Sequence, residues 1–221
     1  MSGAPEMILG IDTSGKNLGF SLGENGRIIA SELSRPGLRH GEILQSALDE
    51  FLVKNNISLT TLAGISVILG PGSFTGLRIG LAAAKGYCYS LQLPLAGISS
   101  LRAVAALYPS EAGKLIVVAD AGRKELYYAM FECGQNALAR LGPDSIGGLK
   151  EISALAADKC HICGPGHLKE RIMAGVELCD YYISDNFNLA EPAVLIGEQK
   201  LADGDYLELK TATPVYVRPN F

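Results

Sequence analysis

The sequence predicts an α/β protein made of two related halves, and three observations support this. Two short apolar runs, Met7–Asp12 and Leu115–Asp120, each end in an acidic residue. Segments that alternate like hairpin strands follow each run, and segments with helical periodicity come after them. The repeated order indicates a duplicated unit of three strands, a helix, a strand and a helix. We expect one lobe over residues 1–103 and another over 104–221, whose last helix could pack back on the first lobe.

The first half shows the clearest elements. Asn25-Gly26 is a strong signal for a tight turn, so the segments on either side of it should form a hairpin. The β-branched, wholly apolar run Ile65–Leu69 indicates an interior strand. The predicted elements are strands at Met7–Asp12, Leu18–Leu22, Arg27–Leu33, Ile65–Leu69 and Leu95–Ile98, and helices at His40–Asn55 and Leu77–Leu91.

The second half repeats the pattern more weakly. A helix near Leu101–Tyr108 should lead into it. The predicted elements after that helix are strands at Leu115–Asp120, Leu126–Cys133 and 160–163, and helices over 146–157, 165–174 and 189–202.

Composition and charge are those of an ordinary globular protein. Apolar residues make up 48% of the chain, and 19 Lys and Arg against 23 Asp and Glu give a net charge of −4. A protein that binds nucleic acid alone usually carries a basic face, so a partner should supply most of any contact with nucleic acid. The N-terminal MSGAPEM lacks a basic start and an apolar run, and five cysteines without a signal peptide suggest buried thiols in the cytoplasm.

The segment Gly70–Gly80 follows a predicted strand and opens a predicted helix. Glycines permit close backbone approach, Thr75 is a candidate N-cap, and the free N–H groups of a helix start could bind an anion. Leu77 and Arg78 follow Gly76, so the spacing is not that of a phosphate-binding P-loop. A tight turn that lets the helix pack closely is the alternative. The residues of this motif loop are Gly70, Gly72, Ser73, Thr75, Gly76 and Arg78.

Acidic residues end the first strand of each half. Asp12 could hold a metal ion through water while Thr13 and Ser14 face a phosphate, and Asp120 repeats this arrangement. Two such strands facing one cleft resemble the actin-like superfamily of sugar kinases and Hsp70 ATPases. Asp12, Thr13, Ser14 and Asp120 are therefore candidates for a vestigial nucleotide cleft. The alternative is that each Asp caps a turn.

Two other features have competing interpretations. Small residues at Gly80 and Ala82–Ala84 allow close helix packing, either on the protein's own sheet or on another protein. Cys160 and Cys163 hint at zinc, but no second ligand pair exists and a strand would point the two thiols in opposite directions. We therefore predict no metal site.

Five blocks together resemble the TsaB (YeaZ) family. They are Ile11-Asp12-Thr13-Ser14, Arg39-His40-Gly41-Glu42, Gly70–Gly86, Ile98-Ser99-Ser100-Leu101 and Asp120–Tyr127. The resemblance covers roughly residues 7–130 and continues faintly to Pro214, Tyr216 and Arg218. It implies an actin-like ATPase (ASKHA, ribonuclease H-like) fold. It also implies work with TsaD, the catalytic threonylcarbamoyl transferase, and with the ATPase TsaE, in making threonylcarbamoyladenosine in tRNA.

Catalytic relatives in this family carry a His-x-x-x-His pair that binds a metal. Here Leu44 stands four residues after His40, so the pair cannot form. Gly41 departs from the usual pattern, where Ser follows His. The resemblance implies association through helices 40–55 and 75–90, and two copies of the chain could pair through the same surface when TsaD is absent. The expected contact residues are His40, Ile43, Leu44, Ala47, Gly80, Ala83, Ala84 and Tyr87.

Two functions from different classes remain open at this point. The first is a non-catalytic binding subunit with no cofactor of its own, ATP and metal being held by its partners. The second is an independent ATP-dependent phosphotransferase or ATPase, which rests on Asp12, Asp120 and the glycine turns. A peptidase comes third because the metal pair is missing. Neither of the first two involves a membrane.

Overall fold

The computed structural model describes residues 7–35, 39–108, 113–134, 138–156, 160–176 and 179–218. The chain divides into two compact units, Met1–Ser100 with Asn188–Val215, and Leu101–Phe187 with Tyr216–Phe221. This division differs from the expected lobes of residues 1–103 and 104–221 mainly where the last helix packs back on the first lobe, a return that the expectation allowed. Residues 188–215 return to the first unit, because their helix packs on the first sheet.

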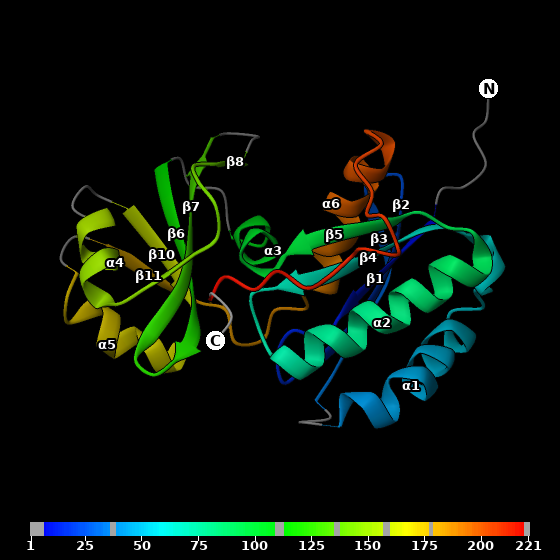
Figure 1. Ribbon diagram of the computed structural model, residues 1–221. Helices are drawn as coiled ribbons and strands as arrows, with labels where there is room; N and C mark the ends of the chain where they lie inside the picture. Colours follow the sequence, from blue (N-terminus) through cyan, green and yellow to red (C-terminus); the bar gives the residue numbers. More distant parts are fainter. Residues whose placement is uncertain are drawn as a thin grey trace. The chain divides into compact units, whose positions relative to one another are not determined.

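The first unit is a five-stranded sheet with helices on both faces (Figure 1). Its strand order is β3-β2-β1-β4-β5, with β1 antiparallel to β2 and parallel to β4. Its elements are β1 (Met7–Asp12), β2 (Leu18–Glu24), β3 (Arg27–Ser34), α1 (His40–Lys54), a 3₁₀ turn (Leu59–Thr61), β4 (Leu62–Gly70), α2 (Phe74–Leu91), β5 (Leu95–Ser99) and α6 (Ala190–Ala202).

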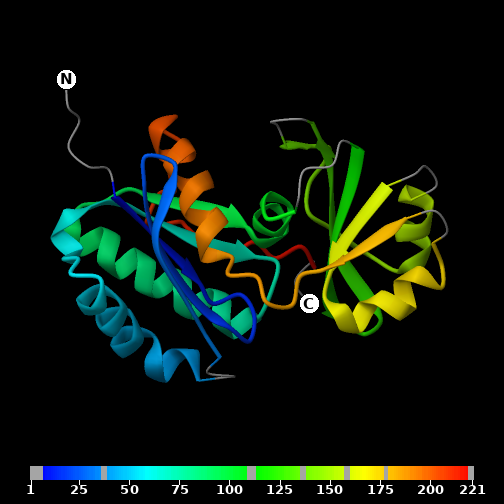
Figure 2. The same cartoon turned by 180° about the vertical axis from the view of Figure 1, so that it is seen from behind.

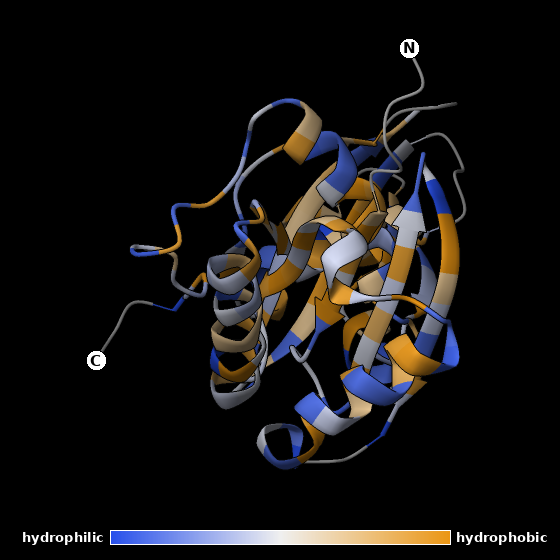
Figure 3. Ribbon diagram, turned by 90° about the vertical axis from the view of Figure 1, so that its right-hand side faces the viewer, coloured by the Kyte–Doolittle hydropathy of each residue, from blue (hydrophilic) through white to orange (hydrophobic). Residues whose placement is uncertain are grey.

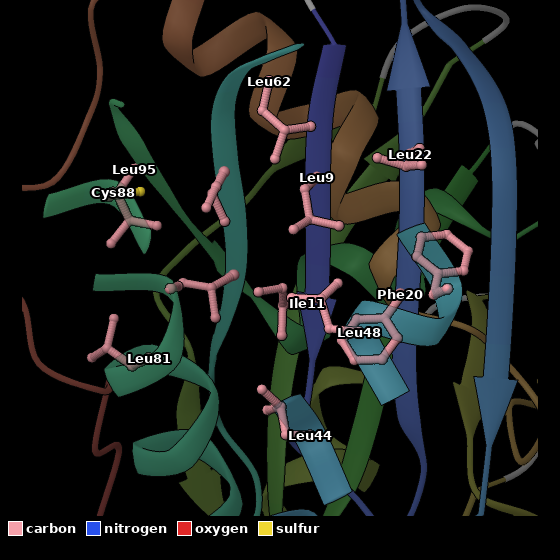
Figure 4. Packing of buried hydrophobic residues seen from close by; sticks show 14 of the residues in the cluster. Leu9, Ile11, Phe20, Leu22, Leu44, Leu48, Leu62, Leu81, Cys88 and Leu95 are labelled. Atoms are coloured by element: carbon pink, nitrogen blue, oxygen red, sulfur yellow. The ribbon is translucent and has the colours of Figure 1, made fainter. Parts of the chain in front are cut away.

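Alternation along the strands decides which helix covers which face. Leu9 and Ile11 of β1 join the hydrophobic cluster that includes Leu44, Leu48 and Leu81 of α1 and α2 (Figure 4). Gly10 points the other way, where an added Cβ would lie 2.4 Å from the Ala190 carbonyl oxygen of α6. The view from behind shows α6 on that face (Figure 2). The strands are largely hydrophobic, while the helices alternate between hydrophobic and hydrophilic residues (Figure 3).

The second unit repeats the strand order of the first. Its order is β8-β7-β6-β10-β11, with β6 antiparallel to β7 and parallel to β10. Its elements are α3 (Ser100–Ala106), β6 (Gly113–Gly122), β7 (Glu125–Cys133), β8 (Leu138–Arg140), β9 (Ser145–Gly147), α4 (Leu149–Leu155), β10 (Cys160–Gly164), a 3₁₀ turn (Gly166–Leu168), α5 (Lys169–Met173) and β11 (Asp180–Ile183). The predicted duplication is confirmed.

The five cysteines are buried, as predicted, and none of them forms a disulfide. Cys160 and Cys163 belong to different hydrophobic clusters, so they do point to opposite faces of β10. Among the residues that the structure describes, no group of three or more His, Cys, Asp or Glu side chains could hold a metal ion. None of the described helices is long and apolar enough to cross a membrane.

Candidate functional site

The end of β1 forms a closed corner. Asp12 is 4% exposed, and its carboxylate accepts hydrogen bonds from the backbone N–H (2.8 Å) and the hydroxyl (2.6 Å) of Ser14. Burial raises the pKa of Asp12 above its ordinary value, although both bonds from Ser14 and the charge of His40 act in the opposite direction. Thr13 is fully buried and donates its hydroxyl to the Gly76 carbonyl oxygen at 2.7 Å.

Glycines at the start of α2 (Phe74–Leu91) and in the loop before it allow close contact with Thr13 and Ser14. A Cβ on Gly76 would lie 2.1 Å from the Thr13 carbonyl oxygen, and one on Gly80 would lie 2.2 Å from the Thr13 hydroxyl. Gly72 approaches the Ser14 carbonyl in the same way. The start of α2 therefore packs backbone to backbone on the Asp12 corner, which favours the tight-turn interpretation of this motif.

Ser73, not the expected Thr75, caps α2, because its hydroxyl accepts the Gly76 N–H at 3.2 Å while Thr75 is exposed. The hydroxyls of Thr13 and Ser14 donate to the Gly76 carbonyl oxygen and to the Asp12 carboxylate, which favours the interpretation that Asp12 caps a turn.

The rest of the motif loop is also held by internal contacts. Gly70 has φ +113°, a conformation that favours glycine, and its neighbour Pro71 accepts a hydrogen bond from the Ser100 hydroxyl at 2.6 Å. The guanidinium carbon of Arg78 lies 3.7 Å from the centre of the Phe74 ring, which leaves the cation on the outer side of α2.

Asp120 forms the matching corner of the second unit, and it is open. Its carboxylate accepts the Gly122 N–H at 2.8 Å, as Asp12 accepts that of Ser14, and lies 3.2 Å from His167 Nε2. The Asp120 side chain is 47% exposed. The bond from Gly122 lowers the pKa of Asp120, and His167 and the charge of Arg171 add to this, while partial burial opposes it.

A groove of about 560 Å³ runs between α1 and α2 on the surface of the first unit. Small side chains of α2 form its floor, and the Tyr87 hydroxyl donates to Gln45 across it. Tyr87 is half-buried, and burial together with the charge of Asp49 raises the pKa of its hydroxyl. The lining residues are Gly41, Leu44, Gln45, Ile79, Ala82, Ala83, Gly86, Tyr87 and Ser90.

The structure changes the expected set of contact residues. Ile43, Ala47, Ala83 and Tyr87 are partly exposed. Gly80 and Ala84 pack inward, against Thr13 or the sheet, and Leu44 is buried in the core although it also lines the groove.

His40 also needs a correction as a direct contact. It is 4% exposed, and its Nε2 lies 2.9 Å from the Asn17 carbonyl oxygen, to which it donates. The imidazole therefore fastens the start of α1 to the segment after β1.

Six groove residues were not among the expected contacts, namely Gly41, Gln45, Ile79, Ala82, Gly86 and Ser90, and helical spacing could have found several of them. Ile79, Ala82 and Gly86 lie on α2 at intervals of three or four residues, and Gln45 lies on α1 one residue beyond Leu44. The sequence alone could not tell this outer stripe from the inner one at Gly76 and Gly80.

Two sheets of the same topology, each with an acidic residue at the end of its first strand, define an actin-like ATPase (ASKHA, ribonuclease H-like) fold. A solved structure of YeaZ from Pseudomonas aeruginosa has this fold too. It superposes with a TM-score of 0.80 at 23% identity, over 96% of this chain and 99% of that one.

Family comparisons place the chain within this class. The family model "TsaD: tRNA N6-adenosine threonylcarbamoyltransferase" matches residues 34–184. The Bacillus subtilis "tRNA threonylcarbamoyladenosine biosynthesis protein TsaB" is 32% identical over 62% of this chain and 60% of its own length. The Escherichia coli protein with the same description is 27% identical over 96% of this chain and 95% of its own length. The chain belongs to the TsaD family, and within it to the TsaB (YeaZ) type.

Proposed function

We propose that this chain is the non-catalytic subunit of a complex that makes N6-threonylcarbamoyladenosine in tRNA, where it binds and supports a TsaD-type catalytic subunit. The descriptions of the Bacillus subtilis and Escherichia coli relatives support the role in threonylcarbamoyladenosine synthesis. The match to the TsaD family model supports a partner of similar fold.

The observation that carries the proposal is the groove between α1 and α2. Ala82, Ala83 and Gly86 give it small side chains on α2 that let another helix approach this stretch closely, beside the bridge from Tyr87 to Gln45. Exposed hydrophobic side chains lie on the same two helices, with Val53 76% and Tyr89 74% exposed. An apolar surface of this kind is typical of a protein–protein contact.

The closed Asp12 corner supports a binding role over an independent ATPase. The polar groups expected to face a phosphate, those of Thr13 and Ser14, are used inside the protein. Leu44, at the position of the second metal-binding histidine in catalytic relatives, is buried in the core. The chemistry then belongs to the TsaD-type subunit, with a TsaE-type ATPase in the complex and tRNA reached through it. Two copies of this chain pair through the groove when the partner is absent.

Reconstitution tests this proposal. Modified nucleoside would be measured by mass spectrometry after mixing TsaD- and TsaE-type subunits, threonylcarbamoyl donor, ATP and tRNA. We expect modification only when this chain is present. Full modification without it would overturn the proposal.

A groove variant locates the contact. Ala82→Arg puts a cation into the groove, and burying it unpaired should weaken binding to the TsaD-type subunit at least about tenfold. Ala106→Arg, the same change at an exposed residue of α3, should bind like the wild type. Matching melting temperatures would show that both variants fold, and equal affinities would place the contact elsewhere.

Calorimetry separates the alternative function. An independent ATPase should bind ATP and Mg²⁺ as an isolated chain and hydrolyse the ATP. The binding-subunit proposal predicts no hydrolysis by this chain alone.

A further inference from the structure

The hairpin between β6 and β7 has an unusual turn. Its two central residues are Arg123 (φ 53°) and Lys124 (φ 65°), and Gly122 pairs with Glu125 across the turn. Positive φ at both central positions is the pattern of a type I′ turn, which favours Asn and Gly. Long side chains are strained in this conformation, and such strain tends to occur where a residue has a functional role.

The hairpin between β2 and β3 provides an internal comparison. It has the same two-residue turn, at Asn25 (φ 53°) and Gly26 (φ 72°), and a β-bulge comes before it as in the other hairpin. This turn has the sequence that the conformation prefers. The same backbone thus occurs twice in the chain, and only the second copy replaces the relaxed residues with two exposed cations.

Two further arginines hold the strained turn in place. Arg171 of α5 donates to the Lys124 carbonyl oxygen. Arg218 donates to the Ala121 carbonyl oxygen at 2.9 Å and lies 2.7 Å from the Glu125 carboxylate. The tip is therefore fastened from two distant parts of the chain, and both fastenings bring positive charge to it.

Charge at the tip differs from that of the whole protein, whose net charge is −4. Four cationic side chains, those of Arg123, Lys124, Arg171 and Arg218, lie at or beside this turn. Glu125 is engaged by Arg218, and Asp120 by Gly122 and His167. Arg123 and Lys124 are exposed at the tip, where they can meet an anion.

We propose that Arg123 and Lys124 form a binding site for phosphate groups of the RNA backbone, so that this chain touches the tRNA directly within the complex. The inference rests on the proposed function, which supplies tRNA as the polyanion. A guanidinium and an ammonium on a rigid turn suit two phosphates of one strand. Such contacts position the RNA without reading its sequence.

The chain itself supplies the test variant. Arg123→Asn with Lys124→Gly copies the Asn25–Gly26 turn, so the variant should fold at least as stably as the wild type. Binding of tRNA to the assembled complex would be measured by fluorescence anisotropy over a series of salt concentrations. Removing two phosphate contacts should reduce the slope of log affinity against log salt by about 1.4 to 1.8 and raise the dissociation constant.

A control with the same charge change is Lys150→Asn with Lys210→Asn, two exposed lysines elsewhere. This control should keep the wild-type slope, because it lowers only the long-range electrostatic attraction to RNA and removes no phosphate contact. An unchanged slope in the turn variant, or an equal loss in the control, would overturn the inference.

Other arms separate this inference from the proposed function. Co-elution of the turn variant with the TsaD-type subunit should be unaffected. If the wild-type chain fails to associate or is not needed, the proposed function fails. If the wild-type chain and the turn variant both associate with the TsaD-type subunit and their complexes bind tRNA equally, only the phosphate site fails. Loss of TsaE-type subunit binding or of ATP binding, with tRNA binding unchanged, would assign the tip to a protein or a nucleotide and also overturn it.

Discussion

The Asp12 and Asp120 corners share one local geometry but differ in burial and in the direction of the pKa shift. In each, an acidic side chain at the end of the first strand accepts the N–H of the residue two positions on, at 2.8 Å. Asp12 is then covered by the glycine-lined start of α2 and has a raised pKa. Asp120 stays half-exposed beside His167 and has a lowered pKa.

This difference shows how the same local geometry can be covered in one unit and exposed in the other. Glycine at position 76 lets the start of α2 approach the Thr13 carbonyl oxygen closely. In the second unit the side chain of His167 lies against the acidic group, and the short hairpin behind it carries Arg123 and Lys124 outward. The first corner is therefore an internal packing contact, while the second stays open to solvent.

Substituting the covering glycine should have the largest effect. Gly76→Ala places a Cβ 2.1 Å from a backbone oxygen, so the start of α2 must move, and we expect a loss of about 3 kcal/mol in the free energy of unfolding. Gly166→Ala is the matched control, because its Cβ meets the movable Asp185 carboxylate at 2.8 Å. Urea denaturation measures the free energy of unfolding of both variants. Equal losses would mean that the corners are packed alike.

The two carboxylates should respond oppositely to pH. The folded pKa of Asp12 is raised, so its contribution to stability falls as pH rises above 3.8, by at most about 1.4 kcal/mol per pH unit. Asp12→Asn keeps an oxygen acceptor and should become more stable relative to wild type over that range.

Asp120 has a lowered folded pKa, so its contribution is present above 3.8 and is lost as pH falls toward the folded value. Asp120→Asn should therefore lose stability relative to wild type as pH rises, by a smaller amount because the group is half-exposed. Denaturation midpoints between pH 3 and 7 would test both variants, and slopes of the same sign would contradict the comparison.

The smallest expected effect concerns the residue after each acid. Thr13→Val removes the buried hydrogen bond to the Gly76 carbonyl at nearly constant volume, and should cost about 1 kcal/mol. Ala121→Thr adds a hydroxyl at the open corner and should change stability by less than about 0.5 kcal/mol. Thermal unfolding compares them. If Thr13→Val is neutral, the closed corner does not depend on that bond.

Much of the fold was predictable because strands and helices leave local patterns. The apolar run Met7–Asp12, the Asn25-Gly26 turn and the helical stripe from His40 all correspond to elements with nearly the expected bounds. The cap of α2 was not predictable in the same way. Ser73 and Thr75 have equivalent hydroxyls, and Ser73 is the one held at the start of the helix, where its backbone N–H donates to the Ser14 carbonyl oxygen at 2.7 Å.

By itself the sequence determined the duplicated α/β pattern, the buried first strand of each half and the glycine-rich start of α2. Only the tertiary structure decided which small residues serve the protein's own core and which line the groove, and to which unit α6 belongs. The physical reason is that burial depends on contacts between distant segments, such as Thr13 with Gly76 and Gly10 with Ala190. Periodicity along one segment carries no record of such contacts.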